Sequence, residues 1–519
     1  MTQQSAVNAA GRSVPTEING RPAVPFQGVN KHRPTGNKHG APVRSCADYP
    51  ENGDKRVPSL REALERCGLK DGMVIGTHHH FRDGDLVANQ IFAIAAELGV
   101  RDLVWAPSAS FPCHEVNIKH LESGVIHHIE GSMNGPLGRF CSAGKMRGMG
   151  VLRSHGGRWQ AIQDGDLHID IGVIAAPTSD PFGNANGVRG PSACGPLGFA
   201  LADSMYADNV VVVTDHLVPF PCVPWEIQGN NVDFVVELPT IGDPKKIVSG
   251  TTEVTKSPDR LLIAEYVAHF VAASGILRDG FSFQAGAGGT ALAFALFLKE
   301  MMQERQIKAR FIRGGSTKYL VEMLQAGLTD YILDGQTFDL KGVESLRDHP
   351  HHVATSPFTS YNFHGKGNFA SQVDATVLGA TEVDLDFNAN VVTHSDGVLL
   401  HGIGGWQNCL YGGCVILAIP TFRDRIPVIV DRVTTLCGPG ELIDVIVTER
   451  GIAINPRRED LLETTRNSGL PIRPIEEIKC EVESIVGGPP DKPRLGDKFV
   501  AAVKWVDGTI IDGVRQVIS

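Results

Sequence analysis

Residues 170–186, DIGVIAAPTSDPFGNAN, and residues 374–390, DATVLGATEVDLDFNAN, decide the fold of this 519-residue chain. Aligned without gaps, the two stretches are identical at seven of 17 positions, where roughly one identity is expected from average composition. Each begins with Asp, continues as an apolar run typical of a buried strand, and ends in Asn-Ala-Asn. We interpret them as equivalent parts of an internal repeat.

Two weaker matches extend the repeat toward the C-terminal side. Asp215 and Asp431 each follow an apolar strand-like run, and Asp233 and Asp444 each precede one. Their spacings from the central block differ by several residues, so these matches are less specific. Together with the central block they predict two similar domains in tandem.

Strand-like and helix-like segments alternate around both copies of the repeat. Capping residues and apolar periodicity predict helices at 60–67, 87–98, 258–274 and 290–303. Short apolar runs predict buried strands at 73–77, 103–105, 169–175, 210–214, 234–238, 310–312, 373–379, 427–430 and 443–447. Such alternation is typical of α/β proteins, and we expect two tandem α/β domains with mostly parallel sheets.

Composition places the domain boundaries. Residues 1–54 are rich in Pro, Gly, Asn and Lys and lack apolar periodicity, so we expect an N-terminal arm that is poorly ordered or wraps the surface. The first α/β domain is expected at 55–250 and the second at 255–519.

Bulk properties exclude several classes of function. The net charge of −10 gives no general attraction for nucleic acid. The longest apolar stretch, residues 285–298, is shorter than the roughly 20 residues that a membrane span needs. Residues 1–10 have neither a basic n-region nor an apolar h-region, so we expect no secretory signal. The ten cysteines form no CxxC pair. We therefore expect a cytoplasmic protein with reduced thiols.

Two glycine-rich turns in the second half are candidate anion sites. GAGGT at 286–290 precedes an apolar helix, so the N–H groups of Gly286, Gly288 and Gly289 could face an anion. GIGG at 402–405 could present backbone N–H groups to a developing oxyanion. Ordinary tight turns are the alternative for both, because GxGG alone is no dinucleotide fingerprint.

Charged and imidazole side chains cluster in two motifs of the first half. THHHFRDGD at 77–85 follows a predicted strand, where open α/β sheets bind ligands. Adjacent histidines on a strand point to alternate faces, which disfavours a metal site, whereas Arg82 could grip a carboxylate or be a surface charge. SHGGR at 154–158 offers a similar anion-facing group.

The remaining motifs leave the chemistry open. No GxSxG nucleophile elbow and no P-loop occurs in the chain, which disfavours a Ser hydrolase and a P-loop ATPase. Glu382 follows the second repeat strand and could be a general base, a substrate contact or a solvated charge.

Taken together, these segments resemble the α subunit of citrate lyase, within the coenzyme A transferase superfamily. The resemblance is carried in collinear order by HHFRDGD at 79–85, SHGGR at 154–158, DPFGNANG at 180–187, GAGGT at 286–290, EVDLDFNANVVTHSDGVLLHGIGG at 382–405, RIPVIVD at 425–431 and DVIVTERGIAINP at 444–456. It implies two similar α/β domains with the active site between them. It also implies an enzyme that exchanges acetyl for citryl on the thiol of an acyl carrier protein.

The resemblance further implies the partners and the cofactor. A β subunit would cleave the citryl thioester, and a γ subunit would be the acyl carrier protein. The thiol would belong to the phosphoribosyl-dephospho-CoA group of that carrier, or to CoA, with no cofactor covalently bound to this chain and no metal. Citrate and an acetyl thioester would be the substrates.

Site residues follow from the same motifs. The resemblance places an oxyanion-binding role on Gly402, Gly404 and Gly405, and Glu382 is the candidate side chain for the chemistry. Substrate binding is expected at His79, Arg82, Asp85, His155, Gly157, Arg158, Asn184, Asn186, Gly286, Gly288, Gly289, Asn388, Asn390 and Asn408.

Two departures from the superfamily pattern qualify this reading. Related transferases carry a glutamate that forms a covalent thioester, whereas RGGST at 313–317 has none, so citrate would attack the thioester directly and form a mixed anhydride. Asn408 stands where the family commonly has Asp, which leaves open a citrate analogue such as citramalate. A free-standing CoA-transferase or thioester hydrolase and a non-catalytic scaffold are the alternatives.

Overall fold

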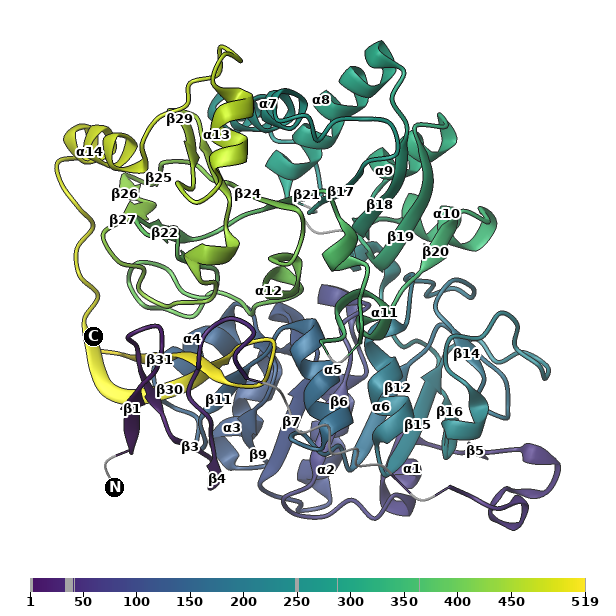
Figure 1. The fold of residues 1–519 in the computed structure, drawn as a ribbon. Coiled ribbons are helices and arrows are strands. Elements are labelled where there is room, and N and C mark those ends of the chain that lie inside the picture. Colours follow the sequence, from purple (N-terminus) through teal and green to yellow (C-terminus); the bar gives the residue numbers. More distant parts are fainter. Residues whose placement is uncertain are drawn as a thin grey trace.

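Two α/β domains follow one another along the chain in a computed structural model (Figure 1). The structure describes residues 3–32, 41, 43–247, 252–286, 288–363 and 365–518. Parts of the expected arm (1–2, 33–40 and 42) and the end of the first expected domain (248–250) lie outside the described residues.

The first domain is built on a parallel sheet of seven strands. Their order is β5 (Arg56–Val57), β16 (Phe234–Glu237), β15 (Asn209–Thr214), β12 (Ile171–Ala175), β6 (Val74–Thr77), β7 (Leu103–Pro107) and β9 (Ile126–Ile129). Its helices are α1 (Leu60–Arg66), α2 (Ala88–Glu97), α3 (Ile118–Ser123), α4 (Pro136–Ser142), α5 (His155–Asp164) and α6 (Leu201–Tyr206).

The second domain is built on an eight-stranded sheet in which only the pair β28–β29 is antiparallel. The order is β20 (His352–Ala354), β19 (Thr329–Thr337), β18 (Ala309–Ser316), β17 (Ser282–Ala285), β21 (Ala375–Leu378), β24 (Cys414–Ala418), β28 (Val445–Thr448) and β29 (Gly451–Ile454). Its helices are α7 (Pro258–Ala273), α8 (Gly289–Arg305), α9 (Lys318–Gln325), α10 (Leu340–Asp348), α11 (Pro357–Tyr361), α12 (Trp406–Cys409), α13 (Glu459–Thr465) and α14 (Ile475–Val486).

The two sheets share one topology. Six neighbouring strands of the first sheet lie in the order β16-β15-β12-β6-β7-β9, and six of the second lie in the order β28-β24-β21-β17-β18-β19. Strands at the same place in these two series also follow one another in the same order along the chain. The prediction of two tandem, similar, mostly parallel α/β domains is therefore confirmed.

The sequence repeat has the same local geometry in both domains. A short antiparallel pair, β13 (Thr178–Ser179) with β14 (Ala185–Asn186), places Thr178 opposite Asn186. In the second domain β22 (Glu382–Asp384) and β23 (Ala389–Asn390) place Glu382 opposite Asn390, at the equivalent register.

One of the weaker repeat matches is confirmed and the other is wrong. Asp233 and Asp444 each precede an equivalent strand, and each carboxylate accepts the N–H of the second residue of the neighbouring strand, Val210 or Val415. Asp215 follows β15 of the main sheet, but Asp431 follows β27 (Ile429–Val430), which pairs with β22 in a separate three-stranded sheet. An apolar run ending in Asp does not reveal which sheet its strand joins.

The C-terminal hairpin crosses back to the first domain. Strands β30 (Leu495–Lys504) and β31 (Ile510–Val517) form a sheet with β11 (Gly150–Leu152), and Figure 1 shows them beside the lower, first domain. Residues 495–517 fall within the expected second domain but pack on the first, because β11 offers them an unpaired edge.

The N-terminal segment covers this hairpin. It contains the short pairs β1 (Ser5–Val7) with β2 (Ser13–Pro15) and β3 (Glu17–Ile18) with β4 (Arg21–Pro22). The side chain of Asn8 is buried and donates to the carbonyl oxygens of Ile510 and Ile511 at 3.2 and 2.8 Å. The described part of this segment is thus attached to the other end of the chain.

The hydrophobic core is continuous between the two domains. One hydrophobic cluster extends from the first sheet to Phe387, Trp406 and Leu410 of the second half. No helix in the described ranges is long and apolar enough to cross a membrane.

Candidate active site

A cavity of about 250 Å³ lies between the two domains. His155 and Phe199 line it from the first domain. The second domain contributes residues at the carboxyl ends of its strands and from α11 and α12, namely Gln284, Ala285, Gly286, Gly314, Gly315, Gly335, Gln336, Phe338, Ser356, Pro357, Ser360, Tyr361, Leu378, Ile403, Gly405, Trp406 and Cys409. The cavity thus lies at the carboxyl ends of parallel strands, where α/β sheets commonly bind ligands.

The SHGGR motif joins the two domains at this cavity. Ser154 caps α5 by accepting the N–H of Gly157 at 3.0 Å. The next N–H groups cross the domain boundary: His155 donates to the carbonyl oxygen of Gly404 at 2.8 Å, and Gly156 donates to Oδ1 of Asn408 at 3.1 Å. Asn408 therefore orients the α5 N-terminus through its side-chain oxygen.

The GIGG turn is packed too tightly for side chains. A Cβ on Gly402 would collide with Ser132, and one on Gly405 would collide with the hydroxyl of Tyr361. Gly404 has φ of +63°, a conformation that L side chains rarely adopt. This turn therefore needs glycine for close packing at Gly402 and Gly405 and for backbone conformation at Gly404.

The GAGGT turn is open by contrast. Among the described residues, a Cβ on Gly286 or Gly288 would meet no atom within 4 Å, and Gly286 lines the cavity. Gly289 begins α8, and residue 287 lies outside the described residues. The free space above this helix N-terminus suits a bound anion.

His79 and His155 form a neutral pair at the domain boundary. Their ring centroids are 5.0 Å apart, and both rings contact Phe199. Burial lowers the pKa of His155 to about 3, with help from the nearby guanidinium groups of Arg158 and Arg313. Burial likewise lowers the pKa of His79 well below its usual range. Both imidazoles are therefore uncharged at neutral pH.

The neighbouring histidines point elsewhere. His78 contacts the carboxylate of Asp203, and Nε2 of His80 lies 2.6 Å from the carbonyl oxygen of Ala175. Among the described residues, the three adjacent imidazoles therefore have three different sets of partners.

Arg82 lies beside the cavity with donor capacity to spare. Its guanidinium carbon is 4.6 Å from the ring of Phe338, which lines the cavity, and 5.6 Å from that of Phe111. Nη1 is buried and has no hydrogen-bond partner in the described structure. Burial lowers the pKa of Arg82 to about 10, which still leaves it charged at neutral pH.

Asp85 and Arg158 have their partners within the protein. Asp85 accepts the N–H of Val87 at 2.9 Å and lies 2.9 Å from Nε2 of His114. Arg158 donates to Asp203 at 2.8 Å and to the carbonyl oxygen of Ala106 at 2.9 Å. Both side chains are buried, and their hydrogen bonds connect segments of the first domain.

The polar residues of the repeat lie outside the cavity lining. Asn184 donates to Asp180 at 2.8 Å, and Asn388 donates to Asp384 at 3.2 Å, so each pair closes its own loop. Asn186 donates to the carbonyl oxygen of Pro224 at 2.9 Å.

Glu382 and Asn390 form a network of their own in the second domain. The carboxylate of Glu382 accepts from Asn390 at 2.8 Å and from the backbone and hydroxyl of Thr434 at 2.8 and 3.0 Å. The carboxylate is buried and fully hydrogen-bonded, as a structural group would be.

Four residues in or behind the cavity wall are not among the candidate site residues predicted from the sequence. Gln284, Tyr361 and Cys409 line the cavity, and Arg313 lies directly behind them. They come from β17, α11, α12 and β18, and only the fold brings them together.

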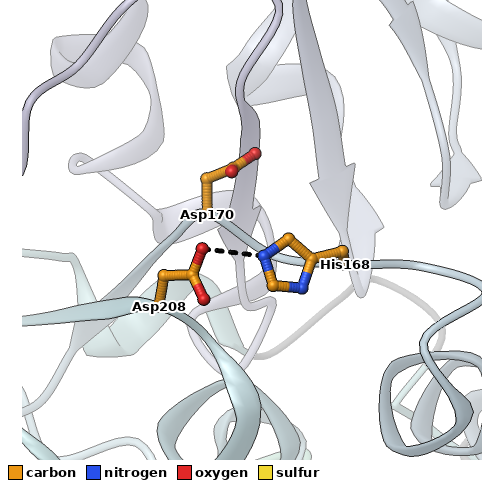
Figure 2. Close-up of side chains that lie close together, drawn as sticks. All are labelled: His168, Asp170 and Asp208. Carbon is orange, nitrogen blue, oxygen red and sulfur yellow. Dashed lines mark hydrogen bonds and ion pairs between the residues drawn. The ribbon is translucent and has the colours of Figure 1, made fainter. Parts of the chain in front are cut away.

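One cluster of metal-type side chains lies elsewhere. His168, Asp170 and Asp208 offer ligand atoms within 4.8 Å of one another at the amino ends of β12 and β15, and His168 pairs with Asp208 at 2.8 Å (Figure 2). Asp170 also accepts the N–H of Val74, just as the repeat-equivalent Asp374 accepts that of Ser282. This cluster lies at the amino ends of two interior strands of the first sheet, and none of its residues lines the cavity.

Comparison with known proteins agrees with this geometry. A malonate decarboxylase alpha subunit from Acinetobacter baumannii has the same fold, with a TM-score of 0.59 and 16% identity over 85% of this chain and 96% of that one. A citrate lyase alpha subunit from Streptococcus mutans, solved in complex with citrate, has a TM-score of 0.94 and 41% identity over 99% of this chain and 100% of that one. The citrate lyase alpha chain of Haemophilus influenzae is 41% identical over 89% of this chain and 93% of its own length.

Fold and site define an enzyme of the coenzyme A transferase type, with two similar α/β domains around one cavity. The family model "Citrate lyase, alpha subunit (CitF)" matches residues 53–517. The chain belongs to the citrate lyase alpha subunit family, whose members are the citrate:acetyl-carrier transferase component of citrate lyase.

Proposed function

We propose that the cavity between the domains is where a carboxylate of citrate attacks the acetyl thioester of an acyl carrier protein. The carboxylate oxygen would bond to the acetyl carbon, and the carrier thiolate would leave, giving an acetyl-citryl anhydride. The thiolate would then attack the citryl carbonyl carbon and release acetate. The related structure solved with citrate supports citrate as the acid.

The composition of the cavity wall supports direct attack by citrate without a covalent enzyme intermediate. None of the described residues that line the cavity is Asp or Glu. The described wall therefore offers no enzyme carboxylate to accept the acyl group or the carrier thiol. On this proposal, the attacking carboxylate belongs to citrate. The protein then acts by orienting the reactants and stabilising charge.

Individual roles follow from position. Arg82 has unused donors beside the cavity and would hold a carboxylate of citrate. The amides of the 402–405 turn would stabilise the oxyanion. The open turn at 286–289 would receive the acyl thioester arm, which we assign to the phosphoribosyl-dephospho-CoA group of the carrier.

The partners follow from the family. An alpha subunit implies further subunits, and we assign them to a β subunit that cleaves citryl thioester and a γ subunit that is the acyl carrier protein. We place the complex in the cytoplasm, with acetyl-CoA as a surrogate donor.

The test is to incubate the purified chain with acetyl-CoA and citrate and to follow products by mass spectrometry. Citryl-CoA together with acetate is the expected result. Acetate without citryl-CoA would show hydrolysis instead, and a requirement for added carrier protein would show that CoA is no surrogate. Intact-protein mass after exposure to acetyl-CoA alone should show no adduct, since an enzyme-bound CoA would contradict direct attack.

A further inference from the structure

Arg313 is a buried charge with no carboxylate partner among the described residues. Its side chain is 1% exposed. Nη1 donates to Oε1 of Gln284 at 2.6 Å and to Sγ of Cys409 at 3.6 Å, and the guanidinium lies 4.3 Å from the ring of Tyr361. Nε has no partner, and no carboxylate forms an ion pair with Arg313 in the part of the chain that the structure describes.

The other buried arginines are different. Arg153 pairs with Glu130 at 2.7 Å, and Arg158 pairs with Asp203 at 2.8 Å. Removing a charge from water is costly unless an opposite charge accompanies it. Arg313 thus differs from the two other arginines whose side chains are fully buried in the described structure.

The immediate neighbours cannot serve as the counter-charge. Burial raises the pKa of Tyr361 to about 12, so its phenol stays neutral at neutral pH. Gln284, which accepts from Nη1 of Arg313, is a neutral amide. Among the described residues, no carboxylate and no ionised phenol therefore compensates the positive charge of Arg313.

The location of this charge is at the cavity. Gln284, Tyr361 and Cys409 all line it, as do Gly314 and Gly315, which directly follow Arg313. In this water-poor wall the charge acts over several ångströms with little screening. An anion in the cavity would meet a positive potential before making any direct contact.

We propose that the counter-charge of Arg313 is the carboxylate of the acceptor acid, so that Arg313 is a positioning residue that determines the affinity of the cavity for that anion. The inference rests on the proposed function of the cavity. It assigns to Arg313 a role separate from that of Arg82, which lies on the side formed by Phe111 and Phe338.

The test uses Arg313→Met, which removes the charge, Arg313→Lys, which keeps it, and Arg158→Met as the matched control. Citrate binding is measured by calorimetry without an acyl donor, and thermal unfolding is followed with and without citrate. Arg313→Met should weaken citrate binding about 10- to 100-fold, and Arg313→Lys should weaken it much less. Without citrate, Arg313→Met should unfold at or above the wild-type temperature, because it removes an uncompensated charge, whereas Arg158→Met should unfold below it.

Unchanged citrate affinity in Arg313→Met would overturn the inference. If Arg313→Met does not fold, Arg313→Lys decides, since a loss of affinity above tenfold in a folded variant that keeps the charge would also overturn it. Malate and acetate are included as further probes. If the wild type binds malate but not citrate, and Arg313→Met binds neither, citrate is the wrong acid but the role of Arg313 stands. A wild type that binds no carboxylate would overturn both the proposed acid and the role of Arg313.

Discussion

The backbone N–H of His155 in the first domain donates to the carbonyl oxygen of Gly404 in the second at 2.8 Å. This bond ties the start of α5 to the turn that carries the proposed oxyanion site. The side chain of His155 and the backbone of Gly405 both line the cavity, so the bond fixes its two walls relative to each other. Transfer should therefore depend on the geometry of this junction.

Replacing Gly404 separates the effect of backbone strain on stability from the effect of an added side chain on transfer. Its φ of +63° means that Gly404→Ala should cost about 1–2 kcal/mol of stability, while Gly404→Asn, which tolerates this region better, should cost less. Both side chains would point toward His155, whose Nε2 lies 3.8 Å from the position of a Cβ. We expect transfer to fall sharply in both variants, and full activity in Gly404→Asn would remove this turn from the mechanism.

Replacing Arg82 tests the carboxylate contact. Arg82→Gln should raise the KM for citrate about 10- to 100-fold and leave the KM for the acyl donor within a few-fold, because a charged hydrogen bond to citrate is lost. Arg61→Gln is a control, since Arg61 pairs with Glu97 at the surface far from the cavity. Equal effects on both KM values would instead indicate a structural role for Arg82.

Replacing Glu382 distinguishes chemistry from packing. Its carboxylate accepts three hydrogen bonds from Asn390 and Thr434, so Glu382→Gln places an NH2 group against donors and should cost about 1–3 kcal/mol of stability. We expect kcat at low temperature to change by less than about threefold. A fall of more than a hundredfold in a variant with unchanged urea midpoint would establish Glu382 as a general base.

Acid should destabilise the protein through its buried histidines. Burial lowers the pKa of His155 to about 3 and that of His80 to about 4, below the unfolded value of 6.5. As the pH falls below 6.5, only the unfolded chain takes up these protons, so stability is lost by at most about 1.4 kcal/mol per pH unit for each histidine.

Urea unfolding at pH 7 and pH 5 measures this effect. His155→Asn should show a weaker pH dependence than the wild type by about one proton. His269→Gln, which changes a half-exposed residue of α7, should keep the wild-type dependence. Identical dependence in His155→Asn and the wild type would mean that His155 does not titrate as its burial requires.

Much of the fold could be predicted because its signals are local. The helix start at Ser59, whose side chain accepts the N–H of Glu62, and the apolar runs of the sheets can be read from neighbouring residues. The candidate site was predictable only in part. His155, Gly286 and Gly405 line the cavity, and Arg82 borders it, but the repeat residues Asn184 and Asn388 close loops instead. A motif repeated in both domains reports the shared structure as readily as a shared site.

The sequence by itself determined two tandem α/β domains and the motifs that mark the family, because strand and helix periodicity is written in consecutive residues. Only the tertiary structure decided that the C-terminal hairpin joins β11 of the first domain, and that Gln284, Arg313, Tyr361 and Cys409 meet at one cavity wall. The hairpin contact pairs Gly150 with Ala501, and at the cavity wall Cys409 contacts Gln284 from 125 residues away. The balance of charge in a buried site depends on such distant neighbours, and no local pattern records them.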